Sequence, residues 1–216
     1  AVLCNIGSAN GPRLAERLAT IVLDADADQA IAVNAVEPFI VLPAATLRHY
    51  AGGYRDPSSR HVMKISIEQS DLLLTGAPFP LRLGATSTTE FRSKGAPITV
   101  GLEFGSDART MRVDIPGSPS LHYRSVDLAS PGVDRFSDYT GSYFSDEIQS
   151  RYFVRLENQQ LILRRGTEED ELLIPTTDDA FQVQGLALEF ARDSEGRVST
   201  LTVSAGRMLG VRFERE

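Results

Sequence analysis

The feature that most constrains this chain is an internal repeat with an offset of 89 residues. A period of this length is too long for a solenoid unit and is typical of a duplicated small domain. We therefore expect two copies of one fold, at residues 46–127 and 128–216, after an N-terminal segment at residues 1–45. Nine positions carry the repeat, since Leu47, Tyr50, Gly52, Tyr54, Met63, Ile65, Ile67, Leu72 and Leu74 recur as Phe136, Tyr139, Gly141, Tyr143, Tyr152, Val154, Leu156, Leu161 and Leu163.

Each copy has the hydrophobic pattern of short β-strands. In the second copy Tyr152, Val154 and Leu156 alternate with outward neighbours, which is the period of two that a half-buried strand requires. Gly196 can supply the positive φ of a hairpin turn. Three hairpins are predicted in this way: residues 62–68 with 71–75, residues 151–157 with 160–164, and residues 186–191 with 198–204.

The number of strands indicates the fold class. About eight short strands per copy, with turns about every 8 to 12 residues, favour a mainly β chain of two tandem antiparallel up-and-down β-barrels. A tight sandwich is the alternative. The linker at residues 125–134, which contains Pro131 and Gly132, has no periodicity of its own.

Residues 1–45 have a different pattern. Residues 1–5 are predicted to form a short apolar strand, and Pro12 stands at the first position of an amphipathic helix. One strand and one helix cannot bury an apolar stripe alone, so we expect the helix to pack on a barrel, on another domain or on a second copy of the chain as a homodimer. Because the sequence opens on Ala1, we expect the chain to belong to a longer or processed protein. The stripe consists of Leu14, Leu18, Ile21 and Val22.

The composition excludes several classes of function. A hydrophobic content of 42% and a charged content of 24% describe a chain with a packed core. A net charge of -7 argues against a nucleic-acid partner, which requires a basic surface. The longest apolar run, residues 39–42, is far shorter than the ~20 residues of a transmembrane helix. The single Cys4 forbids an intrachain disulfide but leaves open a bacterial cytoplasm, a periplasm or secretion.

No cofactor or metal ion is predicted. The alternating Asp24, Asp26 and Asp28 resemble a calcium loop, but the glycine at its sixth position and the glutamate at its twelfth are missing. The histidines have no second ligand two to four residues away, so a zinc site is not expected at His49, His61 or His122.

Two acidic loops hold the candidate binding residues. Asp146 and Glu147 follow one predicted strand, and Glu168, Glu169 and Asp170 lie at a predicted hairpin tip. A solvated turn is the structural interpretation of each loop, and contact with a cationic ligand is the functional one. The sequence has no glycine-rich phosphate loop, no nucleophile elbow and no readable pair of catalytic carboxylates, so no catalytic residue is assigned.

Motifs along the whole chain occur in a specific order. Residues 1–5, followed by residues 10–15 and 18–21, resemble the last core strand and C-terminal helix of the penicillin-recognising serine hydrolases. This superfamily includes class C beta-lactamases, DD-peptidases and D-aminopeptidases. The Tyr-x-Gly-x-Tyr segments that begin at Tyr50 and Tyr139 resemble the β-barrel modules that follow the catalytic domain in many of them. The second copy resembles the C-terminal barrel of D-aminopeptidase-like proteins more closely, through residues 143–147, 188–198 and 210–215.

The catalytic motifs of that superfamily are missing from this sequence. Neither Lys64 nor Lys94 has a serine three positions earlier, so the Ser-x-x-Lys nucleophile motif does not occur. No Tyr-x-Asn occurs, and the Ser-x-Asn at Ser8 and Asn10 is better explained as helix capping.

The resemblance implies a non-catalytic C-terminal accessory region of a beta-lactamase-like serine hydrolase of D-aminopeptidase, esterase or peptidase type. Its expected partner is the parent's N-terminal catalytic domain, whose stability, substrate access or assembly the barrels would influence. The alternative is a free-standing, lipocalin-like barrel that binds a small apolar ligand. A filled barrel interior favours the first hypothesis, and an empty interior pocket above ~300 Å³ favours the second.

Overall fold

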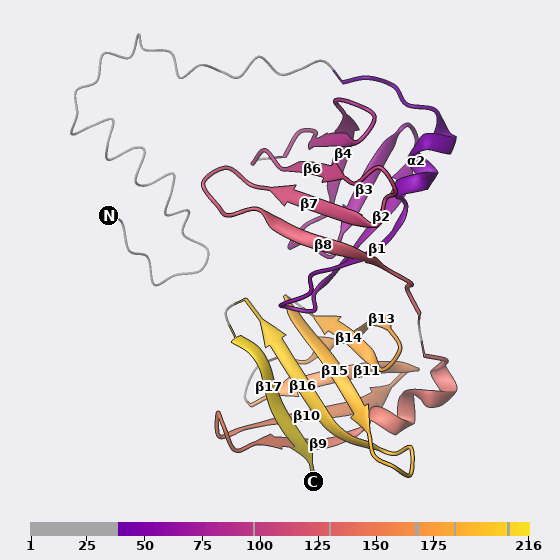
Figure 1. Ribbon diagram of the computed structural model, residues 1–216. Helices are drawn as coiled ribbons and strands as arrows, with labels where there is room; N and C mark the ends of the chain where they lie inside the picture. The colour runs from indigo at the N-terminus through magenta and orange to yellow at the C-terminus, as the bar shows by residue number, and fades with distance from the viewer. Residues whose placement is uncertain (1–38, 97, 130, 167–168, 184, 207) are drawn as a thin grey trace, which may run out of the picture. The chain divides into compact units, whose positions relative to one another are not determined.

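The computed structural model describes residues 39–96, 98–129, 131–166, 169–183, 185–206 and 208–216. Two antiparallel β-sheets, one after the other in the chain, make up most of this part (Figure 1). The predicted N-terminal strand and amphipathic helix lie outside the described residues, and so do Leu14, Leu18, Ile21 and Val22. The homodimer expected through that helix therefore stays a prediction.

The first sheet is a closed barrel, as predicted. Within the described residues its eight strands pair in sequence order, and the last strand pairs back with the first. The short helix α2 (Ala44–Tyr50) precedes the barrel and buries Leu47 and Tyr50. The strands are β1 (Gly52–Arg55), β2 (Val62–Glu68), β3 (Asp71–Thr75), β4 (Leu81–Ala85), β5 (Glu90–Ser93), β6 (Gly101–Phe104), β7 (Thr110–Asp114) and β8 (Leu121–Val126).

The second sheet is also barrel-like, but the described residues form nine strands in it where about eight were predicted. The extra strand arises because Leu173 interrupts one strand, so that β12 pairs with β11 and β13 pairs with β14. A 3-10 helix, η1 (Val133–Tyr139), precedes this sheet. The strands are β9 (Gly141–Ser145), β10 (Ser150–Glu157), β11 (Gln160–Arg165), β12 (Glu171–Leu172), β13 (Ile174–Thr177), β14 (Ala180–Val183), β15 (Leu186–Arg192), β16 (Val198–Ala205) and β17 (Met208–Arg215).

Neither α2 nor η1 was predicted from the sequence. Each is seven residues long and buries two side chains three positions apart, Leu47 with Tyr50 and Phe136 with Tyr139. Two apolar positions are too few to establish a helical period, and this is why the pattern gave no signal. Both helical segments end two residues before the first strand of a sheet, so they occupy equivalent places before β1 and β9.

Each core contains a group of four aromatic rings in mutual contact. In the first barrel Phe104 contacts three rings with centroids 4.6, 5.4 and 5.6 Å away. In the second, Phe190 contacts three rings at 5.0, 5.6 and 5.7 Å. The two cores are therefore related, with Tyr50, Tyr54, Phe91 and Phe104 in one and Tyr139, Tyr143, Phe181 and Phe190 in the other. The tyrosines keep the offset of 89 residues, whereas the phenylalanines are 90 and 86 residues apart.

The Tyr-x-Gly-x-Tyr segments make the same local contact in both sheets. The Tyr54 hydroxyl donates to the Tyr50 carbonyl at 3.1 Å, and the Tyr143 hydroxyl donates to the Tyr139 carbonyl at 2.7 Å. Burial raises the pKa of Tyr54 and of Tyr143 to about 12, so both remain neutral donors.

The glycine between these tyrosines is required by its backbone conformation. Gly52 has a φ of 150° and Gly141 a φ of 153°, values that side chains with a Cβ rarely adopt. Close approach of a neighbouring strand, a second common reason for glycine in a strand, does not apply at Gly52, where a Cβ would meet nothing within 4 Å. At Gly141 a Cβ would lie 2.9 Å from the Arg215 Nε atom, so both reasons apply there.

The predicted hairpins are present. Asn158 and Gln159 form a two-residue turn with φ values of 48° and 63°, as a type I′ turn requires. Gly196 has a φ of 78°, as the sequence predicted.

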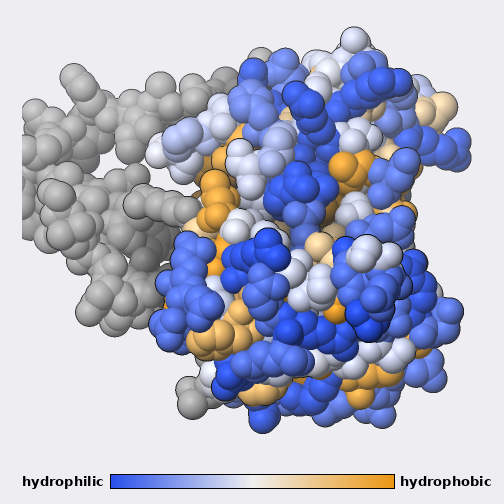
Figure 2. All heavy atoms as spheres, turned by 60° about the horizontal axis from the view of Figure 1, so that its bottom comes forward, coloured by the Kyte–Doolittle hydropathy of each residue, from blue (hydrophilic) through white to orange (hydrophobic). Residues whose placement is uncertain are grey.

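The face in Figure 2 is mostly hydrophilic, and its hydrophobic residues form small separate patches. In the described part of the chain no helix is long and apolar enough to cross a membrane.

Candidate functional site

The predicted acidic residues lie on two hairpins of the second sheet. Asp146 and Glu147 are exposed in the turn between β9 and β10, where the Asp146 carbonyl accepts a hydrogen bond from Gln149 Nε2 at 2.8 Å. Glu169 is exposed between β11 and β12, and Glu168 lies outside the described residues. Contact of these residues with a cationic ligand stays a prediction.

Asp170 is held by arginines on neighbouring strands. Its Oδ1 atom accepts from Arg155 Nη1 at 3.1 Å and from Arg164 Nε at 2.8 Å. The next residue, Glu171, is buried and pairs with Arg165 at 2.7 Å. The end of the acidic run is therefore neutralised within the sheet.

The arginines set the ionisation of Asp170. Hydrogen bonds from Arg155 and then Arg164 lower the pKa of Asp170 to about 2. Its pKa in the unfolded chain is about 3.9, so the carboxylate contributes stability that is present above about pH 4 and is lost as the pH falls toward 2.

We expect the ¹³C carboxyl shift of Asp170 to stay constant from pH 6 to about pH 3 in NMR titrations. The double variant Arg155→Gln/Arg164→Gln should titrate near pH 4. A midpoint near 4 in the folded wild type would contradict this account.

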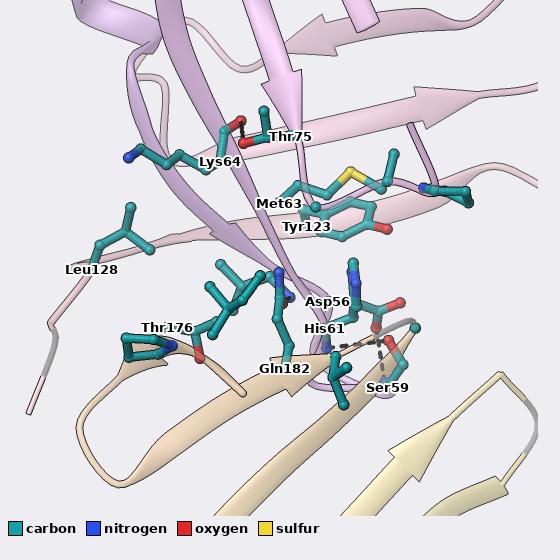
Figure 3. A pocket seen from close by; sticks show the side chains of 18 of the residues that line it. Asp56, Ser59, His61, Met63, Lys64, Thr75, Tyr123, Leu128, Thr176 and Gln182 are labelled. Carbon is teal, nitrogen blue, oxygen red and sulfur yellow. Dashed lines mark hydrogen bonds between the residues drawn. The ribbon is translucent and has the colours of Figure 1, made fainter. Parts of the chain in front are cut away.

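A cleft of about 1280 Å³ lies where the first sheet meets the second (Figure 3). Residues 39–216 form one compact unit, and the cleft is lined from both of its sheets. Met63 and Tyr123, which belong to the buried core of the first barrel, line one side of it. The second sheet contributes residues of β13 and β14, among them Thr176 and Gln182.

Polar contacts join the two sheets beside this cleft. Glu189 on β15 pairs with Arg55 of β1 and, at 2.9 Å, with Arg60 Nε. The Gln182 Oε1 atom accepts from the Val62 backbone amide at 3.2 Å. These contacts connect β14 and β15 of the second sheet to the β1–β2 hairpin of the first. Residues of this hairpin therefore contact the second sheet and also form one wall of the cleft.

The turn before β2 gathers polar groups at one end of the cleft. Asp56 Oδ1 accepts from the amides of Ser58 and Ser59, at 2.7 and 3.2 Å. The Asp56 amide donates to the His61 carbonyl at 2.9 Å, and the His61 amide donates to Ser59 Oγ at 3.4 Å. Within the described residues the His61 ring makes no hydrogen bond to Asp56 or Ser59, so this is a capped turn and not a Ser-His-Asp triad.

Burial determines the charge state at this end of the cleft. Burial lowers the pKa of His61, and the Asp56 carboxylate opposes this in part. Burial, with a smaller contribution from Asp56, raises the pKa of Tyr123 to about 12. At neutral pH the imidazole is therefore neutral and the phenol protonated, and each can hydrogen-bond a ligand in the cleft.

Sequence reasoning missed this cleft. In the sequence His61 is an isolated histidine, and no motif singles out Asp56. The turn chemistry of residues 56–59 is readable from the sequence, because Asp and Ser favour such turns. Gln182 lies 120 residues from its partner Val62, and a single sequence has no pattern that brings the two together.

The residues that the structure describes include no group of three or more His, Cys, Asp or Glu side chains that could hold a metal ion. No family model matches the chain, and no curated protein matches its sequence.

Proposed function

We propose that this chain is a non-catalytic accessory region of a beta-lactamase-like serine hydrolase. The parent performs serine acyl transfer on amide or ester bonds, and its catalytic domain is the partner of the barrels. The barrels stabilise that domain, shape its substrate access or mediate its assembly. The proposal extends the motif order found in the sequence, in which the barrel segments follow residues that resemble the last strand and helix of a hydrolase domain.

The observation that carries the proposal is the filled interior of both sheets. In the second sheet Tyr139, Tyr143 and Phe213 are fully buried, and in the first Leu72 and Leu83 are. A lipocalin-like carrier needs an interior cavity of at least ~300 Å³, and aromatic and aliphatic side chains occupy that space here. A packed barrel offers its outer surface and loops for recognition, which favours an accessory role over an apolar-ligand carrier.

We expect the purified chain to hydrolyse beta-lactams, simple esters and D-amino-acid amides no faster than buffer alone. The physical reason is that the sequence has neither a Ser-x-x-Lys nucleophile nor a Tyr-x-Asn partner. A chromogenic assay on repurified protein measures this directly. Activity that survives repurification and disappears in a His61→Gln variant would contradict the proposal, because it would place catalysis in the cleft.

The codons upstream of Ala1 provide a second test. A reading frame that continues upstream through Ser-x-x-Lys and Tyr-x-Asn motifs would support the accessory role. A start codon next to Ala1 would overturn it and favour a free-standing binding module.

A further inference from the structure

We propose that one end of the cleft binds an aliphatic carboxylate, with its carboxylate at Lys64 and its alkyl chain between Leu128 and Ile174 (Figure 3). The ligand class is a straight-chain monocarboxylic acid of medium length, such as octanoate. This site goes beyond the accessory function and does not depend on it.

Lys64 lies on the outer face of the first barrel. The next residue of β2, Ile65, is 1% exposed in the barrel core, so Lys64 points to the opposite face. The Lys64 carbonyl accepts a hydrogen bond from the Thr75 hydroxyl at 3.4 Å, whereas its ammonium group makes no ion pair with the described residues. The other lysine of the sequence, Lys94, is paired with Asp71 at 2.7 Å. The Lys64 charge is therefore available to an anion.

Leu128 provides an apolar wall next to this charge. Gly53 pairs with Lys64 across β1 and β2, and a Cβ on Gly53 would lie 2.5 Å from Leu128 Cδ2. The Leu128 side chain therefore covers the strand beside Lys64, and Figure 3 shows the two side chains on the same side of the cleft. Leu128 remains 41% exposed, so a ligand can bury more of it.

The second sheet provides another apolar wall. The Ala129 amide donates to the Thr176 carbonyl at 3.2 Å, which holds the residue after Leu128 against β13. Ile174 lies two residues before Thr176 on the same strand, lines the cleft and is 53% exposed. An alkyl chain between Leu128 and Ile174 would bury apolar surface on both walls, which is favourable.

The single charge at this end of the cleft selects a monoanion. Lys64 is the one lysine or arginine among the described residues that line the cleft, and Asp56 is the one carboxylate. Figure 3 shows Gln182, which contacts the Val62 amide, between Lys64 and Asp56. One cation beside two aliphatic side chains matches a ligand with one negative charge and an apolar chain.

The cleft is large enough for such a ligand. Its volume is about 1280 Å³, and small-molecule sites begin at roughly 300 Å³, so an aliphatic acid needs only part of the space. The ligand can therefore bind at the Lys64 end without reaching Asp56.

The test titrates sodium octanoate into the isotopically labelled full chain, with backbone amide shifts as the readout. We expect saturable shifts at Lys64, Leu128 and Thr176. Octanamide, which lacks the negative charge, should bind about tenfold more weakly, because it loses a charged hydrogen bond. Hexanoate should also bind about tenfold more weakly, because it buries two fewer methylene groups. These changes leave the protein unaltered, so the test does not depend on the folding of a variant.

Matched variants assign the two parts of the ligand. Lys64→Gln should weaken octanoate about tenfold and leave octanamide unaffected, whereas Lys64→Arg should retain octanoate binding. Leu128→Ser should weaken both ligands alike, because it removes an apolar wall and no charge. Arg48→Gln, at an exposed cation on α2 outside the cleft, is the control and should change nothing.

Four results would each overturn the proposal. They are equal affinity for octanoate and octanamide, equal affinity for octanoate and hexanoate, shifts confined to surfaces other than the Lys64 end of the cleft, and no saturation at about 10 mM octanoate.

Discussion

Replacing Phe190 by alanine is expected to lower the free energy of unfolding by about 3 to 5 kcal/mol. Phe190 is 5% exposed and lies among the rings of Tyr139, Tyr143 and Phe181, with centroid distances of 5.0 to 5.7 Å. Removing the ring leaves a cavity that those neighbours cannot fill, because the strands behind them are held in place by their hydrogen bonds.

Guanidinium unfolding together with hydrogen exchange measures this effect. Phe104→Ala is the equivalent change in the first barrel, and the two cores share no buried residue. Phe190→Ala should therefore increase exchange mainly in β9–β17, and Phe104→Ala mainly in β1–β8. The matched control is Phe153→Ala, since Phe153 is 43% exposed on the second sheet and its loss should be small. A loss for Phe190→Ala no larger than for Phe153→Ala would show that the ring is not a core residue.

The strands could be predicted because their signal is local. Alternation at Tyr152, Val154 and Leu156 places three side chains on one face whatever the rest of the chain does. The strand predicted at residues 151–157 is β10, Ser150–Glu157, and its partner at residues 160–164 is β11, Gln160–Arg165. Repetition of such hairpins favours a meander, whereas closure of the first barrel depends on the pairing of β8 with β1, which are distant in the sequence.

The interruption at Leu173 could not be predicted, because it depends on contacts across the sheet. The Leu173 amide donates to the Leu161 carbonyl at 2.9 Å, while the following residues pair with β14. Whether a strand continues or divides at such a point depends on both neighbours, and the pattern of the strand itself does not record them.

The candidate site also combines residues that are close together in the sequence with partners that are far apart in it. The loop position of Asp170 is local and was predicted, but its partner Arg155 lies 15 residues earlier on another strand. The polar end of the cleft at residues 56–61 comes from one turn, whereas Gln182 and Ile174 come from the second sheet. Only the tertiary fold brings these groups together.

The tyrosine that precedes each sheet has a different hydrogen-bond acceptor in the two copies. The Tyr50 hydroxyl donates to the Thr88 carbonyl at 2.9 Å. The equivalent Tyr139 hydroxyl donates to the Asp179 carboxylate at 2.6 Å. Asp179 also receives Arg192 through Nε at 3.1 Å and Nη2 at 3.0 Å. One carboxylate therefore connects η1, the β13–β14 turn and β15.

Asp179→Ala is expected to destabilise the protein by about 3 kcal/mol, near the lower limit for breaking a buried ion pair. The lower limit applies because the Asp179 and Arg192 side chains are 26% and 21% exposed. The variant leaves Tyr139 without its acceptor, and it places alanine at a φ of 53°, where a Cβ is disfavoured. Asp178→Ala is the matched control, because Asp178 is exposed and should change stability by less than about 0.5 kcal/mol.

The pH dependence of this loss distinguishes the ion pair from the backbone effect. Burial alone would raise the pKa of Asp179, but hydrogen bonds from Arg192 and Tyr139 outweigh it and lower the pKa below its usual value. The carboxylate therefore contributes stability above its unfolded pKa of about 3.9, and this contribution is lost as the pH falls through the lower folded value. Asp179→Asn accepts the positive φ and isolates the charge, so its difference from wild type in urea unfolding should be largest near pH 7 and should shrink below about pH 4. A difference that is the same at both pH values would show that the charge of Asp179 does not stabilise the second barrel.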